Sequence, residues 1–299
     1  FTNNDSAYET ALEFKKQGVH PIILDTREEH SSELIETVKS NNIQIKFSYA
    51  VIAANGYKKV KSALIGKLNR DKTDFENSET IECDCICVSG FWTPTVHLAS
   101  QSGNKLKFND QIDAFVPDKS KQNETSVGAS KGTFTLKETL NDGFKTGFDL
   151  SKKITKNNNS TSTPNSNETK KNPHDKFWCS PLPKDKNYKR FVDFQNDVAV
   201  SDIEVALREG YRSIEHVKRY TTLGMATDQG RTSNLNGLQL VANVEKKIVP
   251  QVGHTTFRPP FTPITIGTIV GREVDMEYMP TRKTPMHTWH EKNNAVFVD

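Results

Sequence analysis

The chain has 299 residues with 40 basic and 37 acidic side chains, which gives a formal net charge of +3. This near balance, without a basic stripe interleaved with aromatic residues, argues against a nucleic-acid partner. No apolar run reaches the ~18 residues that suggest a membrane span. We therefore expect roughly two domains with buried cores, no membrane insertion and, by default, a cytoplasmic location.

Both ends of the chain indicate an internal fragment of a longer protein. The sequence opens on Phe1 without a methionine and stops at Asp299, directly after the apolar, strand-like AVFV. A domain normally ends on a flexible or capped segment. We expect further domains on both sides, with the true N-terminus and any targeting signal upstream.

Residues 1–27 read as strand, tight turn, helix and strand. Ala7, Ala11 and Phe14 recur at helical spacing, and PIILD is a short apolar strand that ends in Asp25. In this βαβ layout a glycine-rich turn cradles a pyrophosphate, and an acidic residue at the end of the second strand holds a ribose hydroxyl. Asp25 lies about 20 residues after the turn, as that role requires.

The turn itself departs from the glycine pattern. Related pyridine-nucleotide-dependent oxidoreductases carry G-G-G-x-S-A, whereas this chain carries TNNDSA. Asparagine tolerates left-handed backbone but adds bulk, and Asp5 brings a negative charge towards an anion site. A dinucleotide site and a retained scaffold both stay open. The candidate contacts are Thr2, Asn3, Asn4, Ser6 and Asp25.

Three cysteines cluster in ECDCICVSG. Read as a strand, Cys83, Cys85 and Cys87 point to one face at a spacing of about 6.6 Å. Tetrahedral zinc needs sulfurs roughly 3.8 Å apart, so a straight strand cannot present all three thiols to one ion. We expect buried free thiols in a reducing compartment and no metal site.

Two later segments, CVSGFWTPTVHL and TSVGASKGTFTLKETLNDG, resemble the returning segments of a disulfide-reductase-like flavin domain. The resemblance implies that Gly90 and Gly128 contact a cofactor. The alternative is that both are ordinary turn glycines. It also implies an α/β fold in which residues 1–80 form a NAD(P)-binding Rossmann insertion. Residues 81–150 would complete an outer domain of FAD/NAD-binding type, whose principal half lies upstream.

A polar run rich in Asn, Ser, Thr and Lys follows from Ser151 to Asp175. Such a segment buries too little apolar surface to offset its ordering entropy. Residues 151–176 are therefore expected to be a disordered linker.

The next segment predicts a helix pair. Ser201 and Glu204 form a capping box, and the helix that they start should end at Gly210 as a left-handed cap. Ser213 starts a second helix whose Ile214 and Val217 face the first. Lys218 and Arg219 are then expected at the exposed end of this helix.

The stretch YRSIEHVKRYTTLGMATDQGRTSN resembles an iron–sulfur module of the bacterioferritin-associated-ferredoxin type without its cysteines. Asp228 stands where the last thiolate would be, and Asp193 and Gln195 lie near the expected C-x-C. A four-cysteine cluster needs thiolate ligands, so no cluster is expected. Such a cysteine-free module is similar to the third domain of α subunits of heterotetrameric sarcosine oxidase, here residues 177–258.

Residues 259–299 resemble the start of a folate-binding aminomethyltransferase domain, truncated here. His287 and His290 are weak metal-ligand candidates because no third ligand accompanies them. Tetrahydrofolate chemistry would therefore belong to the missing part of that domain.

The family implies oxidative demethylation of sarcosine to glycine, with hydrogen peroxide formed and the one-carbon unit passed to tetrahydrofolate. It also implies NAD in the α subunit, FAD and FMN in or at the β subunit, and β, γ and δ partner subunits. Lys218 and Arg219 would face the flavin-bearing partner and the phosphate of its flavin. We expect no catalytic residue in this chain. A non-catalytic scaffold, or a related proline dehydrogenase or cyanide-forming glycine oxidase, stays an alternative.

Overall fold

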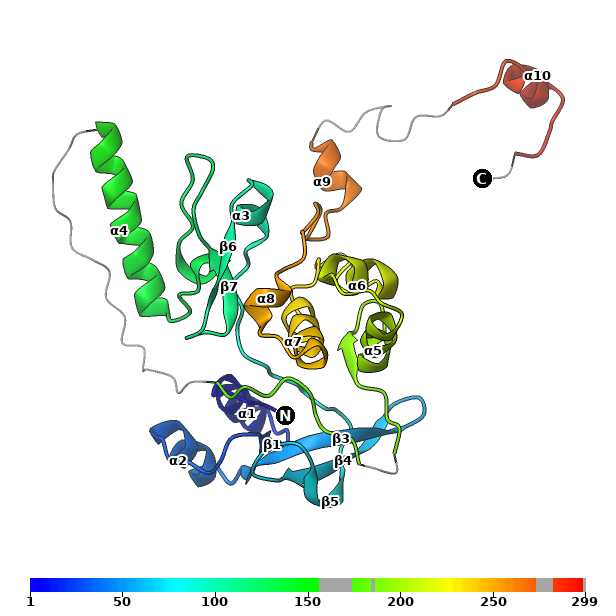
Figure 1. The fold of residues 1–299 in the computed structure, drawn as a ribbon. Coiled ribbons are helices and arrows are strands. Elements are labelled where there is room, and N and C mark those ends of the chain that lie inside the picture. The colour runs from blue at the N-terminus through cyan, green and yellow to red at the C-terminus, as the bar shows by residue number, and fades with distance from the viewer. Residues whose placement is uncertain (156–173, 184–185, 273–281, 298–299) are drawn as a thin grey trace. The chain divides into compact units, whose positions relative to one another are not determined.

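The computed structural model describes residues 1–155, 174–183, 186–272 and 282–297, which form a mixed α/β chain (Figure 1). The chain divides into two compact units, Phe1–Arg258 and Pro259–Asp299. Over the described ranges, no helix combines the length and the apolar character needed to cross a membrane.

The first unit opens with a small parallel sheet and two helices. Helix α1 (Ser6–Lys16) leads into strand β1 (Ile22–Asp25), and α2 (Glu33–Ser40) leads into β2 (Gln44–Phe47), which pairs in parallel with β1. Their apolar faces meet in a cluster built from Tyr8, Ala11, Ile23, Ile35, Val38 and Ile43. The helix and the second strand predicted before Arg27 are thus confirmed, although Phe14 remains 38% exposed. The strand predicted before the turn is wrong, because the chain there forms only isolated bridges from Thr2 to Asp25 and Ser89.

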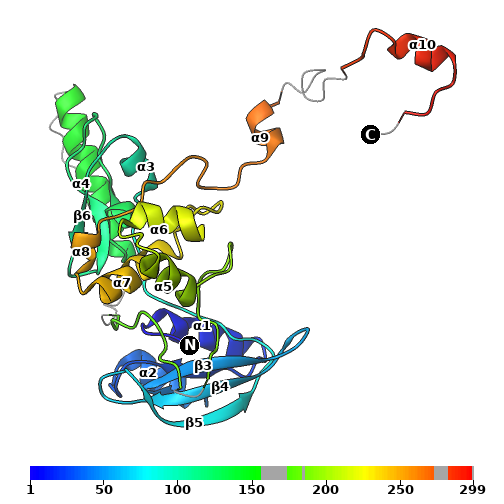
Figure 2. The same ribbon diagram turned by 45° about the vertical axis from the view of Figure 1, so that its right-hand side comes forward.

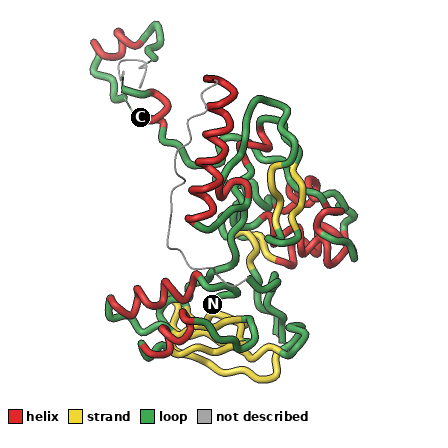
Figure 3. Tube along the Cα trace, turned by 90° about the vertical axis from the view of Figure 1, so that its left-hand side faces the viewer, coloured by secondary structure: helices red, strands yellow, loops and turns green. Residues whose placement is uncertain are grey.

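An antiparallel meander follows, with strands β3 (Tyr49–Gly56), β4 (Val60–Leu68) and β5 (Phe75–Glu82) in that order (Figure 3). Ile65 at the centre of β4 is fully buried and packs with Ala63 and with Leu24 of β1. The meander is therefore anchored on the parallel sheet through apolar contacts.

The cysteine segment does not continue strand β5. Cys83 donates its amide to the Lys61 carbonyl at 3.1 Å, and the pairing ends there. Cys83 is half-buried, whereas Cys85 and Cys87 are exposed. The prediction of buried thiols on one strand face is therefore wrong for Cys85 and Cys87: the chain leaves the sheet after Glu82, and among the described residues this segment is paired only by an isolated bridge between Thr2 and Ser89.

The middle of the first unit is irregular. It contains α3 (His97–Gln101), the hairpin β6 (Leu106–Asn109) and β7 (Ala114–Pro117), the short 3-10 turn η1 (Gly128–Lys131) and the long helix α4 (Leu136–Thr155). Helix α4 runs five residues into the segment predicted as a linker from residue 151. Most of that predicted linker, residues 156–173, lies outside the described residues.

The last part of the first unit is a helical module (Figure 2). A short hairpin, β8 (Phe191–Asp193) and β9 (Val198–Ala199), precedes α5 (Val200–Arg208), α6 (Ile214–Thr221), α7 (Asn234–Glu245) and α8 (Val249–Val252). Their shared core contains Ile203, Leu207, Ile214, Val217, Leu223, Leu238 and Val241. The predicted helix pair is confirmed, and Ile214 and Val217 face the first helix as expected.

The ends of helix α5 agree with the prediction on one side only. Gly210 has φ +97° and closes the helix as a left-handed cap. At the start, however, Ser201 lies inside the helix, and Asp202 accepts a 2.8 Å hydrogen bond from the Ala199 amide. The predicted Ser201 cap is wrong because the helix begins at the buried, apolar Val200.

Among its described residues, the second unit has the short helices α9 (Ile266–Val270) and α10 (His287–Lys292). None of its described side chains is buried. His287 lies 3.1 Å from Glu291 of the same helix. Its assignment to the start of an aminomethyltransferase domain stays a prediction.

Candidate functional site

The turn predicted to hold a dinucleotide is buried within the first unit. Thr2 donates its amide to the Leu24 carbonyl at 2.8 Å and accepts from the Thr26 amide at 3.0 Å, so the turn starts as an extension of the parallel sheet. Residues 2–5 each expose only 2–7% of their surface. Access to this turn is therefore closed by other parts of the unit.

Asparagine side chains cross-link the turn to its surroundings. The Asn4 carbonyl oxygen Oδ1 accepts from the Ser6 amide at 2.9 Å and from the Ser6 hydroxyl at 2.6 Å. The Asn4 amide group donates to the carbonyls of Ser89 and Gly90. Asn3 donates from Nδ2 to the carbonyl of Asp175 at 2.8 Å. The first amide of helix α1, which would face a phosphate in a dinucleotide site, is thus capped by Asn4.

An ionic cluster lies directly behind the turn. Arg27 reaches Asp5 at 2.7 Å with Nη1 and Asp25 at 2.7 Å with Nη2. Tyr8 donates its hydroxyl to Asp25 Oδ2 at 2.7 Å. Burial works against the charge of Arg27, but its hydrogen bonds to Asp25 and Asp5 outweigh burial and raise its pKa. Burial first, and then Asp25, raise the pKa of Tyr8.

Both oxygens of Asp25 are therefore engaged inside the protein. Oδ1 accepts from the Arg27 amide at 2.9 Å and from Arg27 Nε at 3.1 Å, while Oδ2 accepts from Tyr8 and Arg27. The side chain is fully buried. The role of Asp25 at a ribose hydroxyl stays a prediction. Sequence reasoning missed its partners Arg27 and Tyr8. The signal was an arginine placed two residues after a strand-end aspartate.

The predicted glycine contacts lie in turns. Gly90 is exposed, and its carbonyl accepts from Asn4. Gly128 has φ +63° and donates its amide to Asp142 Oδ2 at 2.8 Å. That hydrogen bond lowers the pKa of Asp142, and Lys131 adds to the effect. Both glycines stay cofactor-contact predictions, and Asp142 is a partner that the sequence did not indicate.

The cysteine-free turn of the helical module is held by Asp193. Its Oδ1 accepts from the Gln195 amide at 2.9 Å, and its Oδ2 accepts from the Gly224 amide at 2.8 Å. The Ser233 hydroxyl lies 3.5 Å from the same Oδ2. Asp193 is 3% exposed. A carboxylate near the expected C-x-C thus joins the β8–β9 loop to the turn after α6.

Asp228, at the position of the last thiolate, and Gln195, near the expected C-x-C, also accept hydrogen bonds in this turn. Asp228 accepts from the Gly230 amide at 3.0 Å and from the Thr232 hydroxyl at 3.0 Å. Gln195 accepts from the Thr227 hydroxyl at 3.2 Å. At or near the positions that would hold thiolates in the resembling iron–sulfur modules, this chain therefore has hydrogen-bond acceptors that organise the turn.

Two glycines let the turn close on Asn234. Gly224 and Gly230 have φ +66° and +74°. A Cβ added at Gly224 would lie 2.2 Å from Asn234 Oδ1, and one added at Gly230 would lie 2.1 Å from Asn234 Cγ. Both positions therefore need glycine for conformation and for space.

The basic pair of helix α6 is split between core and surface. Lys218 is only 6% exposed and donates to the Thr256 carbonyl at 2.8 Å, whereas Arg219 is exposed. Burial lowers the pKa of Lys218. The prediction that both residues stand at an exposed helix end is wrong for Lys218. It lies one turn after Ile214, so its stem follows the core-facing side of the helix.

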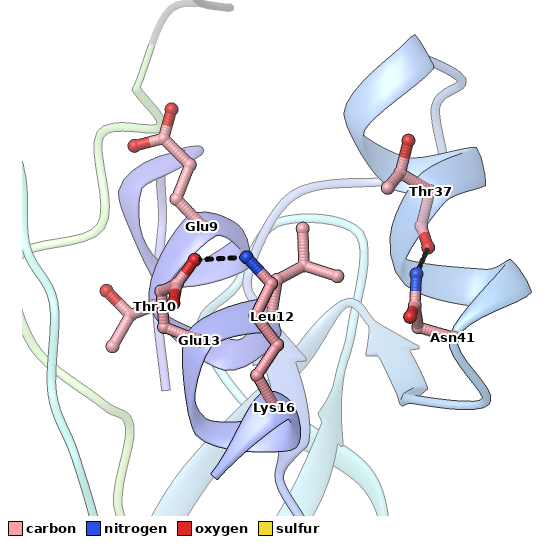
Figure 4. A pocket seen from close by; sticks show the side chains of 7 residues that line it. All are labelled: Glu9, Thr10, Leu12, Glu13, Lys16, Thr37 and Asn41. Carbon is pink, nitrogen blue, oxygen red and sulfur yellow. Dashed lines mark hydrogen bonds and ion pairs between the residues drawn. The ribbon is translucent and has the colours of Figure 1, made fainter.

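A surface groove runs between helices α1 and α2 (Figure 4). It is lined by Glu9, Thr10, Leu12, Glu13, Lys16, Thr37 and Asn41. Lys16 pairs with Glu13 at 2.6 Å, and both side chains are about two-thirds exposed. The groove contains none of the predicted cofactor contacts. Within the part of the chain that the structure describes, no three or more His, Cys, Asp or Glu side chains are grouped to hold a metal ion.

Comparison with known proteins identifies the relatives of the chain. Residues 187–272 match the model of the sarcosine oxidase A3 domain. The whole chain is 32% identical to the sarcosine oxidase subunit alpha of Rhizobium meliloti (strain 1021) and 33% identical to that of Corynebacterium sp. (strain P-1). The chain spans 29% and 31% of the length of these two relatives.

Among solved structures, L-proline dehydrogenase from P. horikoshii matches the fold with a TM-score of 0.61 and 17% identity. The match covers 91% of this chain and 54% of the dehydrogenase chain. This likeness shows the fold alone. Together the comparisons confirm the resemblance to sarcosine oxidase α subunits and the mixed α/β fold.

Proposed function

Because the chain is homologous over its whole length to part of sarcosine oxidase α subunits, we propose that it is a section of such a subunit. In this proposal the assembled enzyme converts sarcosine to glycine with formation of hydrogen peroxide and passes the one-carbon unit to tetrahydrofolate. The observation that carries the proposal is the 32% identity over 100% of the chain, together with the A3 match.

The hydrogen-bonded turn of the helical module supports this choice over relatives that keep an iron–sulfur cluster. Asp228 stands at the last ligand position, Asp193 and Gln195 lie near the expected C-x-C, and all three accept hydrogen bonds within the turn or from it. These contacts give the turn a stable conformation without metal. Metal analysis of the intact subunit should find no iron, whereas about two irons per chain would favour a cluster-bearing dehydrogenase or oxidase.

We infer that the turn of residues 2–6, called the loop 2–6 from here on, has a structural role and does not bind a dinucleotide. A pyrophosphate needs close backbone approach and free amides at the start of a helix. Here the Ser6 amide bonds to Asn4, and Asp5 and Asp25 add two buried carboxylates around Arg27. These residues do not fit a dinucleotide. NAD would then bind in another part of the subunit, with FAD and FMN in or at the β subunit.

The exposed Arg219 is the better candidate for contact with a flavin-bearing partner. It lies at the end of α6, free of the core contacts that hold Lys218. Guanidinium groups bind phosphate in a bidentate manner, which suits a flavin phosphate at a subunit boundary. The β, γ and δ subunits are the proposed partners.

Co-expression with a flavoprotein partner subunit tests the proposal. The purified complex should consume sarcosine and oxygen and release hydrogen peroxide, and omission of this subunit should abolish assembly or turnover. Oxidation of L-proline with a dye acceptor and no peroxide would instead assign the chain to a dehydrogenase. A partner that turns over sarcosine equally well without this subunit would leave it a non-catalytic scaffold.

A further inference from the structure

Two exposed thiols face each other in the segment after strand β5. Cys85 Sγ lies 3.9 Å from Cys87 Sγ, and both side chains are exposed. The other two cysteines are less accessible: Cys83 packs against the apolar cluster around Ile65, and Cys179 lies against Arg190 at 3.3 Å. A reagent in solution therefore meets Cys85 and Cys87 as a pair.

The separation of these two sulfurs is within reach of a covalent bond. A disulfide needs sulfurs about 2.05 Å apart and Cα atoms within about 7 Å. Residues separated by one position have Cα atoms at most about 7 Å apart even in extended chain. The backbone of residues 83–88 belongs to no helix or strand, so small side-chain and backbone rotations can bring the sulfurs together.

We propose that Cys85 and Cys87 form a site of reversible oxidative modification, at which a peroxide converts the two thiols into an intrachain disulfide. One thiolate attacks a peroxide oxygen, the O–O bond breaks, and a sulfenic acid and water form. The second sulfur then attacks the sulfenic sulfur, the S–O bond breaks, and the S–S bond forms with loss of another water. The two sulfurs lose two electrons to the peroxide, and a dithiol reductant reverses the change.

The site stands apart from the proposed enzymatic function, because it needs only an added peroxide. Although the Cys87 side chain is exposed, partial desolvation by nearby atoms raises the pKa of its thiol and contact with Cys85 adds to this, so little thiolate is present at neutral pH. The oxidation is therefore slow and needs sustained exposure to peroxide.

A disulfide between Cys85 and Cys87 would restrain the backbone next to the loop 2–6. Ser89 donates its amide to the Phe1 carbonyl at 2.9 Å, and its hydroxyl lies 2.7 Å from the Ser6 hydroxyl. The segment that carries the two thiols is thus tied to the start of helix α1. A ring between Cys85 and Cys87 restrains the chain immediately before this attachment.

Intact-mass spectrometry of the chain with Cys83→Ser and Cys179→Ser tests the proposal, because only Cys85 and Cys87 remain. Hydrogen peroxide should remove two hydrogen atoms from the chain and abolish labelling by a maleimide, and dithiothreitol should restore both thiols. In a Cys85→Ser variant of the wild-type chain, Cys87 should instead accumulate as a sulfenic acid that dimedone captures.

Addition of oxygen atoms without loss of hydrogen would overturn the proposal, as would a chain-to-chain dimer on a non-reducing gel. If the double variant does not fold, fragmentation of the oxidised wild-type chain decides. A linkage between Cys85 and Cys87 supports the site, and a linkage to Cys83 or Cys179 contradicts it.

Discussion

Two polar regions of the first unit, the loop 2–6 and the turn 224–234, hold buried carboxylates by different means. At the loop, Asp5 and Asp25 from the end of β1 share the guanidinium of Arg27. At the turn, Asp193 from the end of β8 accepts hydrogen bonds from the amides of Gly224 and Gln195. Both regions lie where the sequence resembles cofactor-binding motifs, and both are filled by side chains of the chain itself.

The ion pairs at the loop and the amide hydrogen bonds at the turn should differ in how much stability is lost when one side chain is replaced. Removal of the cation of a buried ion pair leaves uncompensated charge, which costs several kcal/mol. An amide-held carboxylate loses only the hydrogen bonds of its own oxygens when it is neutralised. The loop should therefore be the more sensitive region to a single substitution.

The largest expected effect is that of Arg27→Met. It leaves Asp5 and Asp25 buried without their shared cation and should lower the free energy of unfolding by about 3–5 kcal/mol. Urea denaturation measures this. The control Lys16→Met breaks the exposed pair with Glu13 and should cost at most about 1 kcal/mol. Equal costs for the two variants would show that the buried cluster adds no more than a surface pair.

Gly230→Ala probes how tightly the turn closes on Asn234. The new Cβ would meet the Asn234 side chain at 2.1 Å, and the backbone has φ +74°. Overpacking and left-handed strain together should cost about 2–4 kcal/mol. The matched control is Gly210→Ala, which has φ +97° but no atom within 4 Å of its added Cβ. Its cost should be about 1–2 kcal/mol, and a cost equal to that of Gly230→Ala would refute tight closure.

Asp193→Asn tests the amide-held carboxylate directly. One oxygen becomes an amide donor that faces backbone N–H groups, so the free energy of unfolding should fall by about 1–3 kcal/mol. Asp228→Asn, at a more exposed position of the same turn, should cost less. If Asp193→Asn costs as much as Arg27→Met, the contrast between the two regions fails.

The smallest effect concerns Lys218 and pH. Burial lowers the pKa of this amine below the ordinary lysine value of 10.5. As pH rises towards 10.5, the folded chain has released a proton that the unfolded chain still binds, so the free energy of unfolding increases with pH. Lys218→Met should show a smaller increase in this alkaline window, whereas the exposed control Arg219→Met should follow the wild type. Identical pH profiles for all three chains would show that burial of Lys218 has no such effect.

Sequence patterns correctly predicted those helices, strands and caps that depend on residues close together in the chain. Helix α1, strand β1, the helix pair α5–α6 and the cap at Gly210 all follow from apolar spacing and turn residues. The alternating cysteines were misplaced because alternation cannot show whether a neighbouring strand is present.

The side chains of the candidate site were harder to predict because their partners are distant in sequence. Asn3 bonds to Asp175, and Lys218 bonds to Thr256. A charged residue on a helix is usually solvated, so Lys218 was expected at the surface, although its position one turn after Ile214 places it on the core-facing side of the helix. Arg27 carries the loop cluster, yet only its proximity to Asp25 in the sequence pointed to it.

A titration of NAD against the intact subunit tests the central claim that the loop 2–6 is a structural scaffold, buried by its contacts with the rest of the first unit. Calorimetry compares the wild type with Asp5→Gly, which removes the carboxylate nearest the predicted phosphate position and restores a glycine. The account predicts affinities within a few-fold of each other, because the loop does not contact the dinucleotide. A gain of more than tenfold, about 1.4 kcal/mol, would contradict it and place a dinucleotide at this loop.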